Sequence, residues 1–346
     1  MKMKTKNECE ATPAVVDGVA YVGDLEDSLY AIDVATGEAR WVFRNECGFR
    51  VSPLLLDGKL YVGDMDGHMH CFDAEVGKQV WQFDSGTLLS CSANAVDGLV
   101  VFASEDGTVF GLDPKTGKLI WKTSAGTQLQ CAPAISGKRV VIVGCDQQLY
   151  ILDRDTGEQL LTTDIEGPTG ATPAVRDGLA YFGTADEVLF CVEIETGKIR
   201  WRYEARELGD VGRNAAAVTE KLVIIAGRGR DIVAVDVETG KLAWRYHAKG
   251  SFDSSPVVVD DHVLIGSTDG RLYVLGKDTG TVKLIHETGR ALTGSVAVAD
   301  GKLVLAATDG LIYCLGDPTQ QTAKTKDATR KEPLRVVTDV HAGAEV

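Results

Sequence analysis

Two of the six histidines lie close together in the sequence, and this pair is the first candidate for metal ligands. His68 and His70 are separated by one residue and could bind a metal ion as an alternating pair on a strand. The preferred interpretation is structural, with one exposed and one half-buried histidine. The other four, His247, His262, His286 and His341, are widely spaced. The histidines therefore predict no metal site and no catalytic group.

The eight cysteines suggest soft-metal or disulfide chemistry. Cys9 and Cys47 lie in predicted loops, and Cys91 and Cys131 open predicted strands. We expect all four towards one end of the fold, where they could form a soft-metal site or a disulfide. Small residues scattered around a crowded centre are the preferred interpretation, because the four belong to consecutive copies of a repeat. The spacing matches no secreted disulfide framework, which favours free thiols and a reducing compartment.

Two further patterns resemble binding loops. Gly227-Arg228-Gly229-Arg230 contains the glycines of a phosphate loop, but it fills a turn between strands and opens no helix. The Asp-Gly pairs that begin at residues 66, 106, 269 and 309 recur at the equivalent turn, where hairpin geometry rather than calcium requires them. No catalytic constellation emerges from these patterns.

The elements that position these residues repeat eight times. Equivalent copies are 40 residues apart, with a single step of 43 residues before the sixth. They begin at Ala11, Val51, Cys91, Cys131, Ala171, Asn214, Ser254 and Gly294. Self-similarity at this period indicates a propeller or a solenoid.

Each copy predicts four short strands. In the first copy they lie near residues 12–16, 19–23, 29–33 and 39–44, separated by Asp-Gly and Thr-Gly turns. The last copy supplies only three strands, and residues 1–6 align in register with residues 41–46, which start within the fourth strand of the first copy. We therefore predict an all-β, eight-bladed β-propeller of four-stranded antiparallel blades, closed by the N-terminal strand. The propeller spans residues 1–316, and residues 317–346 form a polar tail that we expect to be flexible.

All five tryptophans occupy one position of the repeat, close to the pattern Asp-x-x-Thr-Gly-x-x-x-Trp. They are Trp41, Trp81, Trp121, Trp201 and Trp244, and Leu161, Leu284 and Met1 take this place in the other blades. Residues 1–316 thereby resemble the pyrroloquinoline-quinone (PQQ) repeat family. The resemblance implies that each tryptophan docks between neighbouring blades.

The resembling family has two relevant branches, the quinoprotein dehydrogenases and the BamB-type scaffold proteins of outer-membrane assembly. The dehydrogenase branch uses two adjacent cysteines and a calcium site made of Glu, Asn and Asp. This chain has no adjacent cysteines, and only Asn94 and Asn214 lie on inner strands. We expect no quinone cofactor, no metal and no catalysis. A quinone- or metal-dependent oxidoreductase, or a redox sensor, is the alternative.

The connections that lead into the inner strands predict a binding face. One repeat position carries large apolar residues in five blades: Phe49, Leu89, Leu129, Phe252 and Leu292. The next position is polar and mixed in charge: Glu10, Arg50, Ser90, Gln130, Gly170, Arg213, Asp253 and Thr293. An apolar ring beside a polar ring is typical of a face that binds a protein or a peptide. In the alternative interpretation, the apolar residues fold inward and plug the funnel.

Charge narrows the choice of partner. The chain has 36 basic and 50 acidic residues, for a net charge of −14, which disfavours nucleic acid and anionic lipid. The sequence shows neither a signal peptide nor an 18-residue apolar span. We expect a monomer that does not insert into membranes. Members of the resembling family are commonly exported, so either the protein is cytoplasmic, as this sequence predicts, or a leader is missing from it.

Overall fold

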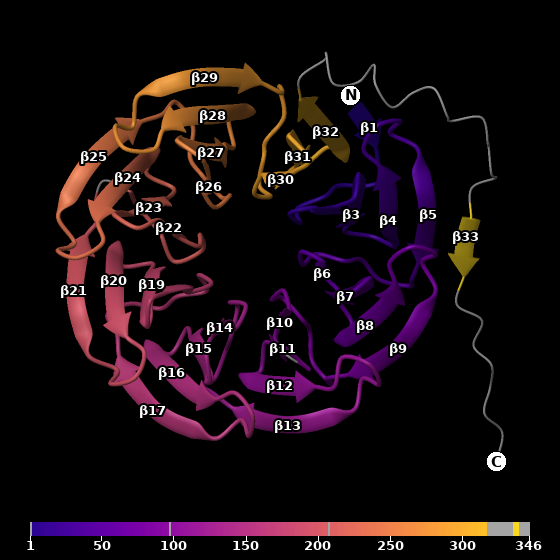
Figure 1. The fold of residues 1–346 in the computed structure, drawn as a ribbon, viewed down its shortest axis with the longest axis horizontal. Helices are drawn as coiled ribbons and strands as arrows, with labels where there is room; N and C mark the ends of the chain where they lie inside the picture. Colours follow the sequence, from indigo (N-terminus) through magenta and orange to yellow (C-terminus); the bar gives the residue numbers. More distant parts are fainter. Residues whose placement is uncertain (1, 97, 207, 317–334, 339–346) are drawn as a thin grey trace.

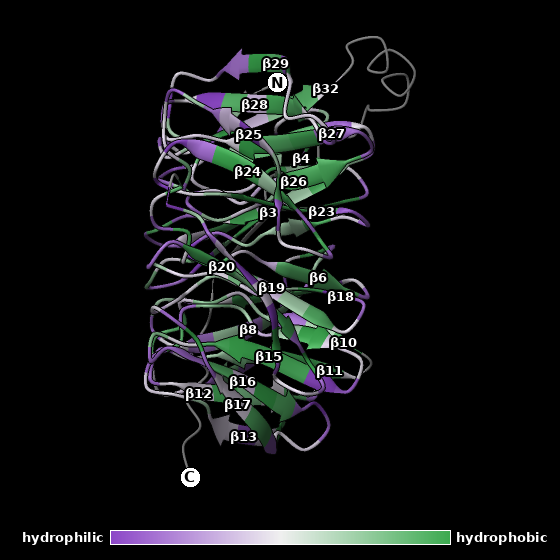
Figure 2. Ribbon diagram, turned by 90° about the vertical axis from the view of Figure 1, so that its left-hand side faces the viewer, coloured by the Kyte–Doolittle hydropathy of each residue, from purple (hydrophilic) through white to green (hydrophobic). Residues whose placement is uncertain are grey.

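Eight antiparallel sheets follow one another around a ring, as Figure 1 shows in a computed structural model of the chain. The structure describes residues 2–96, 98–206, 208–316 and the backbone of 335–338. Seen from the side, the strands are mainly apolar and the turns on both faces mainly polar (Figure 2). The predicted eight-bladed propeller is confirmed. The part of the chain that is described contains no helix that could span a membrane.

The blades share one order of strands from the axis outward. The innermost strands are β2 (Ala14–Val16), β6 (Leu54–Leu56), β10 (Asn94–Val96), β14 (Ala134–Ser136), β18 (Ala174–Arg176), β22 (Ala217–Val218), β26 (Val257–Val259) and β30 (Ala297–Ala299). The second strands are β3 (Val19–Gly23), β7 (Lys59–Gly63), β11 (Leu99–Ala103), β15 (Arg139–Val143), β19 (Leu179–Gly183), β23 (Leu222–Ala226), β27 (His262–Gly266) and β31 (Lys302–Ala306). The third strands are β4 (Ser28–Asp33), β8 (His68–Asp73), β12 (Thr108–Leu112), β16 (Gln148–Asp153), β20 (Val188–Glu193), β24 (Asp231–Asp236), β28 (Arg271–Gly276) and β32 (Leu311–Gly316). The outer strands are β5 (Ala39–Arg44), β9 (Gln79–Asp84), β13 (Leu119–Ser124), β17 (Gln159–Asp164), β21 (Ile199–Glu204), β25 (Leu242–His247), β29 (Val282–Glu287) and, in blade eight, β1 (Lys2–Lys4).

In blades one, two, five and eight the first hairpin follows from its turn residues. Asp17 and Gly18 both have positive φ, at 49° and 71°, as a two-residue type I′ turn requires. The pairs Asp57-Gly58, Asp177-Gly178 and Asp300-Gly301 adopt the same conformation. The second and third strands are almost entirely buried, so the core lies between successive blades.

The ends of the chain close the ring as predicted. β1 pairs antiparallel with β32 in the register Lys2 to Tyr313, Met3 to Ile312 and Lys4 to Leu311. Figure 1 places β1 between the last blade and the first. Met1, predicted to take the tryptophan place in blade eight, lies outside the described residues.

The C-terminal segment adds one strand. β33 (Arg335–Thr338) pairs in parallel with β5 and makes the first blade five-stranded. Its register sets Arg335 opposite Trp41 and Thr338 opposite Arg44. Residues 317–334 and 339–346 lie outside the described residues, and the flexibility of the tail stays a prediction.

The tryptophans join each blade to the next one. Each indole Nε1 donates a hydrogen bond to a backbone carbonyl 33 or 36 residues later, as from Trp41 to Ala74 at 2.9 Å. A Cβ added to Gly77 would lie 2.5 Å from the Trp41 ring, so glycine is needed for the indole to approach. The same contact recurs between Gly117 and Trp81, Gly157 and Trp121, Gly240 and Trp201, and Gly280 and Trp244.

Candidate functional site: the funnel of the ring

The inner ends of the blades surround a polar funnel of about 460 Å³. All eight residues of the polar ring predicted from the sequence line it: Glu10, Arg50, Ser90, Gln130, Gly170, Arg213, Asp253 and Thr293. Glu105 and Arg228 extend the wall from turns between second and third strands. Arg228 was considered only as part of a hairpin turn, and Glu105 was not predicted, because neither belongs to the repeat positions that lead into the inner strands.

The predicted apolar ring is not part of this surface. Phe49, Leu129, Phe252 and Leu292 are 0% exposed and Leu89 is 1% exposed, so the prediction that they contact a partner is wrong for the folded ring. A Cβ added to Gly23, at the end of β3, would lie 2.3 Å from Phe49. Leu89 lies against Gly63, and Leu292 against Gly266, in the same way. The five side chains fold inward, as the alternative interpretation expected, but they fill the space between neighbouring blades and do not plug the funnel.

The arginines of the funnel are exposed and paired with acids. Arg50 Nε lies 3.1 Å from Glu10 Oε2, with the Arg50 side chain 56% exposed. Arg228 Nε lies 2.9 Å from Asp253 Oδ1. Arg213, 62% exposed, lies 3.6 Å from Asp210. Exposed pairs of this kind contribute only about 0–1 kcal/mol to stability, so these arginines can exchange partners at little cost.

A ring of hydroxyl groups underlies the funnel. One repeat position supplies a side-chain oxygen that accepts a hydrogen bond from the backbone N–H of the preceding blade. The bonds run from Thr12 to Ser52, Ser52 to Ser92, Ala132 to Thr172, Ala215 to Ser255, Ser255 to Ser295 and Ser295 to Thr12, at 2.8–3.1 Å. The series is interrupted where Ala132 and Ala215 supply no hydroxyl. The last bond joins blade eight to blade one and so fixes the shape of the funnel.

The inner-strand asparagines bind the backbone through their amide nitrogens. Asn214 donates from Nδ2 to the carbonyls of Ala226 and Phe252, each at 3.0 Å, and Asn94 donates to Pro133 at 3.2 Å. A calcium ion would bind the amide oxygens instead, and it requires several oxygen ligands to converge. Asn214 Oδ1 is buried without a hydrogen-bond partner, and Asn94 Oδ1 accepts a hydrogen bond from the Ala95 N–H at 2.8 Å. In the funnel itself, Glu10 and Asp253 are already paired with arginines.

The cysteines have the character of packed, protonated thiols. All eight are free, and five are buried: Cys9, Cys71, Cys91, Cys131 and Cys191. Burial raises the pKa of Cys131 to about 12 and that of Cys9 to about 11. Cys131 Sγ donates to the Val143 carbonyl at 3.1 Å. A reactive thiol needs a lowered pKa, so these features give no support to the redox-sensor alternative.

The two neighbouring histidines share one buried carboxylate. His70 Nε2 lies 2.7 Å and His68 Nδ1 lies 3.3 Å from Asp64 Oδ2. His70 is 2% exposed and His68 is 31% exposed, which corrects the expectation of one exposed and one half-buried ring. Burial by itself raises the pKa of Asp64, but hydrogen bonds from His70 and from the His68 backbone outweigh it and hold the pKa at about 2.

Comparison with known proteins gives the family. The family model described as outer membrane protein assembly factor BamB matches residues 2–203 and 105–326. None of the curated proteins matches the chain. The fold is similar to that of BamB from Moraxella catarrhalis, at 20% identity and a TM-score of 0.78 over 91% of this chain and 98% of that one.

Two other solved structures share the fold. The computationally designed Ika8 protein is 17% identical, with a TM-score of 0.79 over 91% of this chain and 98% of that one. The quinohemoprotein alcohol dehydrogenase from Comamonas testosteroni is 16% identical, with a TM-score of 0.74 over 91% of this chain and 75% of that one. At these identities the likeness concerns the fold. Because the family model covers most of the ring, the chain belongs to the BamB family of PQQ-like β-propellers.

Proposed function

We propose that the ring is a non-catalytic scaffold that binds an extended segment of a partner protein across its funnel. The observation that carries this proposal is the funnel wall, where three exposed arginines, three acids and a series of hydroxyl groups face one open cavity. Such a wall offers hydrogen bonds to the backbone and polar side chains of a peptide. The Arg50 and Arg213 guanidinium groups can bind carboxylates or backbone carbonyls of the partner.

Membership of the BamB family agrees with this proposal, since the matching family description is that of an assembly factor. The alternative is a quinone- or metal-dependent oxidoreductase. It rests on the likeness to an alcohol dehydrogenase, and at 16% identity that likeness concerns the fold. The pairing of the funnel acids Glu10 and Asp253 with arginines favours the scaffold.

Charge reversal in the funnel tests the proposal. Short random peptides would be selected for binding to the wild-type ring and then titrated with the Arg50→Glu/Arg213→Glu variant. We expect their affinity to fall about tenfold or more, because hydrogen bonds to charged groups contribute about 1.5–3 kcal/mol each. Fluorescence anisotropy of labelled peptides measures this loss.

The matched control reverses two arginines away from the funnel. Arg40 and Arg200 lie on outer strands, are 46% and 38% exposed and are likewise paired with acids. The Arg40→Glu/Arg200→Glu variant should bind the selected peptides as the wild type does. If the selected peptides bind the Arg40→Glu/Arg200→Glu variant weakly and the funnel variant as tightly as the wild type, the binding surface lies on the outer strands. That result would contradict the proposal.

A further inference from the structure

Three metal-ligating side chains converge in blade two, outside the funnel wall. An Asp64 carboxylate oxygen, His68 Nδ1 and His70 Nε2 all lie within 4.8 Å of one another. His68 and His70 are two residues apart on β8, so they lie on the same face of the blade. Asp64 follows β7 directly and accepts hydrogen bonds from the backbone N–H groups of Asp66 and His68, which fixes its carboxylate.

The other blades show which part of this arrangement the fold requires. In blade one Tyr30 donates from its hydroxyl to Asp24 Oδ2 at 3.0 Å. Tyr150 and Tyr273 bond the turn carboxylates of Asp146 and Asp269 in blades four and seven. In blades one and four the third strand thus sends one side-chain donor to the turn carboxylate. In blade seven Arg271, at the repeat position of His68, sends a second one to Asp269 at 2.8 Å. His70 replaces the tyrosine in blade two, and His68, where blade one has Ser28, adds a second imidazole.

The surrounding residues hold the group as outer ligands of a metal would. Gln79 Nε2 lies 3.1 Å from His70 Nδ1 and fixes the ring with Nε2 toward Asp64. Asn45 donates from Nδ2 to Asp64 Oδ2 at 2.9 Å. Metal-binding histidines commonly donate a hydrogen bond from their second nitrogen to such a neighbour. If Gln79 turns its amide, Oε1 can accept that hydrogen bond from His70 Nδ1–H. In this tautomer Nδ1 has taken a proton from solvent, Nε2 has released its proton to solvent, and the ion binds Nε2.

We propose that Asp64, His68 and His70 form a Zn²⁺ site in blade two. Two imidazole nitrogens and one carboxylate are a donor set that zinc accepts, and three protein ligands leave a coordination position for water or a partner's side chain. The half-exposed His68 ring gives the ion a route from solvent to the buried carboxylate. The site is independent of the proposed function, because none of its residues lines the funnel.

The sequence of blade one supplies the variant for the test. His68→Ser/His70→Tyr gives blade two the residues that stand in blade one, so the turn keeps its donor and the fold should persist. We expect the wild type to bind one Zn²⁺ ion in competition with a chromophoric chelator. The variant should bind Zn²⁺ about a hundredfold or more weakly, since changes even to outer ligands cost about 10–100-fold. Zn²⁺ should also raise the melting temperature of the wild type only.

Free thiols are the competing zinc ligands, so Cys47→Ser is the control. Cys47 lies beside Asp64. Its replacement by serine should leave the Zn²⁺ affinity unchanged. Equal Zn²⁺ affinity of the wild type and the double variant would overturn the proposal. Loss of binding in Cys47→Ser alone would overturn it as well. If the double variant does not fold, His68→Ser at its half-exposed position must weaken binding, and unchanged affinity there would refute the site.

Discussion

Deletion of residues 1–8 should open the ring and strongly destabilise it. The deletion removes β1, whose three residues pair with β32, and exposes the edge of that strand. It also removes Thr5, which donates from its backbone and from Oγ1 to the Gly310 carbonyl at 2.8 and 2.9 Å. The Leu25 N–H loses its bond to the Glu8 carbonyl. We expect a lower melting temperature and concentration-dependent aggregation, measured by thermal unfolding and sedimentation velocity.

Complementation in trans separates loss of closure from general damage. A synthetic peptide of residues 1–8, added to the truncated protein, should occupy the free edge of β32 and raise the melting temperature again. A truncated protein that melts at the wild-type temperature would show that the Ser295–Thr12 bond and the inner contacts suffice for closure. That result would contradict the role assigned to β1.

Replacing Phe49 and Phe252 with serine should unfold the ring. Both side chains are 0% exposed, and they belong to separate apolar clusters between blades one and two and between blades six and seven. Deleting a buried phenylalanine side chain costs about 3–5 kcal/mol, and distant sites add. Two such losses approach the total stability of about 5–15 kcal/mol that folded domains have. Chemical denaturation monitored by circular dichroism measures the effect.

Two exposed arginines at the neighbouring repeat position are the matched control for this prediction. Arg50 is the next residue after Phe49 and is exposed, and Arg213 occupies the equivalent position in blade six. Replacing both with serine should leave the melting temperature within a few degrees. A folded Phe49→Ser/Phe252→Ser protein of wild-type stability would show that the two rings do not fill the space between the blades.

The architecture was predictable because the repeat encodes it redundantly. Eight copies of one strand pattern specify the blades, and the alignment of residues 1–6 with the strand at Trp41 predicts the observed pairing of Met3 with Ile312. The polar ring was also predictable, since one repeat position must face the axis in every blade. All eight of its residues line the funnel.

The sequence of one blade does not predict whether its residue of the apolar ring faces a partner or the core. Whether Phe49 faces a partner or the core depends on Gly23, a residue of the preceding blade that leaves room for the ring. A signal exists in the sequence, because Gly23, Gly63 and Gly266 each end the second strand before a large residue in the following connection. The glycine and the large residue can be recognised as contact partners only once the packing between successive blades is known.

The sequence indicated the pair of His68 and His70 but not their shared carboxylate, for a related reason. Sequence spacing relates His68 to His70, but their shared partner is a turn carboxylate four residues before His68. Comparison across the repeat contains the signal, since His70 stands where Tyr30, Tyr150 and Tyr273 bond carboxylates of the same turn, Asp24 in blade one and, two positions later in the turn, Asp146 and Asp269.

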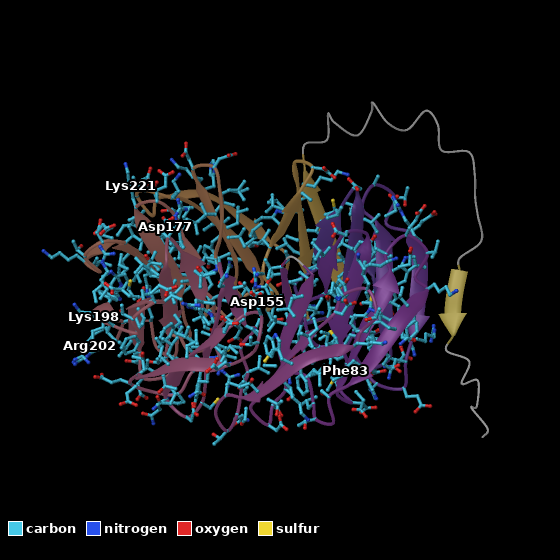
Figure 3. All side chains as sticks on the ribbon, turned by 60° about the horizontal axis from the view of Figure 1, so that its bottom comes forward. Phe83, Asp155, Asp177, Lys198, Arg202 and Lys221 are labelled. Carbon is cyan, nitrogen blue, oxygen red and sulfur yellow. The ribbon has the colours of Figure 1, made fainter. Side chains whose placement is uncertain are left out.

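A photo-crosslinking residue at position 130 tests the central claim, partner binding in the funnel, most directly. Gln130 is exposed and lines the funnel, whereas Arg202, the control position, lies on β21 and points outward at the periphery of the ring (Figure 3). In extracts of the source organism, the funnel position should yield a discrete crosslinked partner, and the Arg50→Glu/Arg213→Glu background should suppress it. A photo-crosslinking residue at position 202 should yield no crosslinked partner. A partner captured from residue 202 and not from residue 130 would contradict the account.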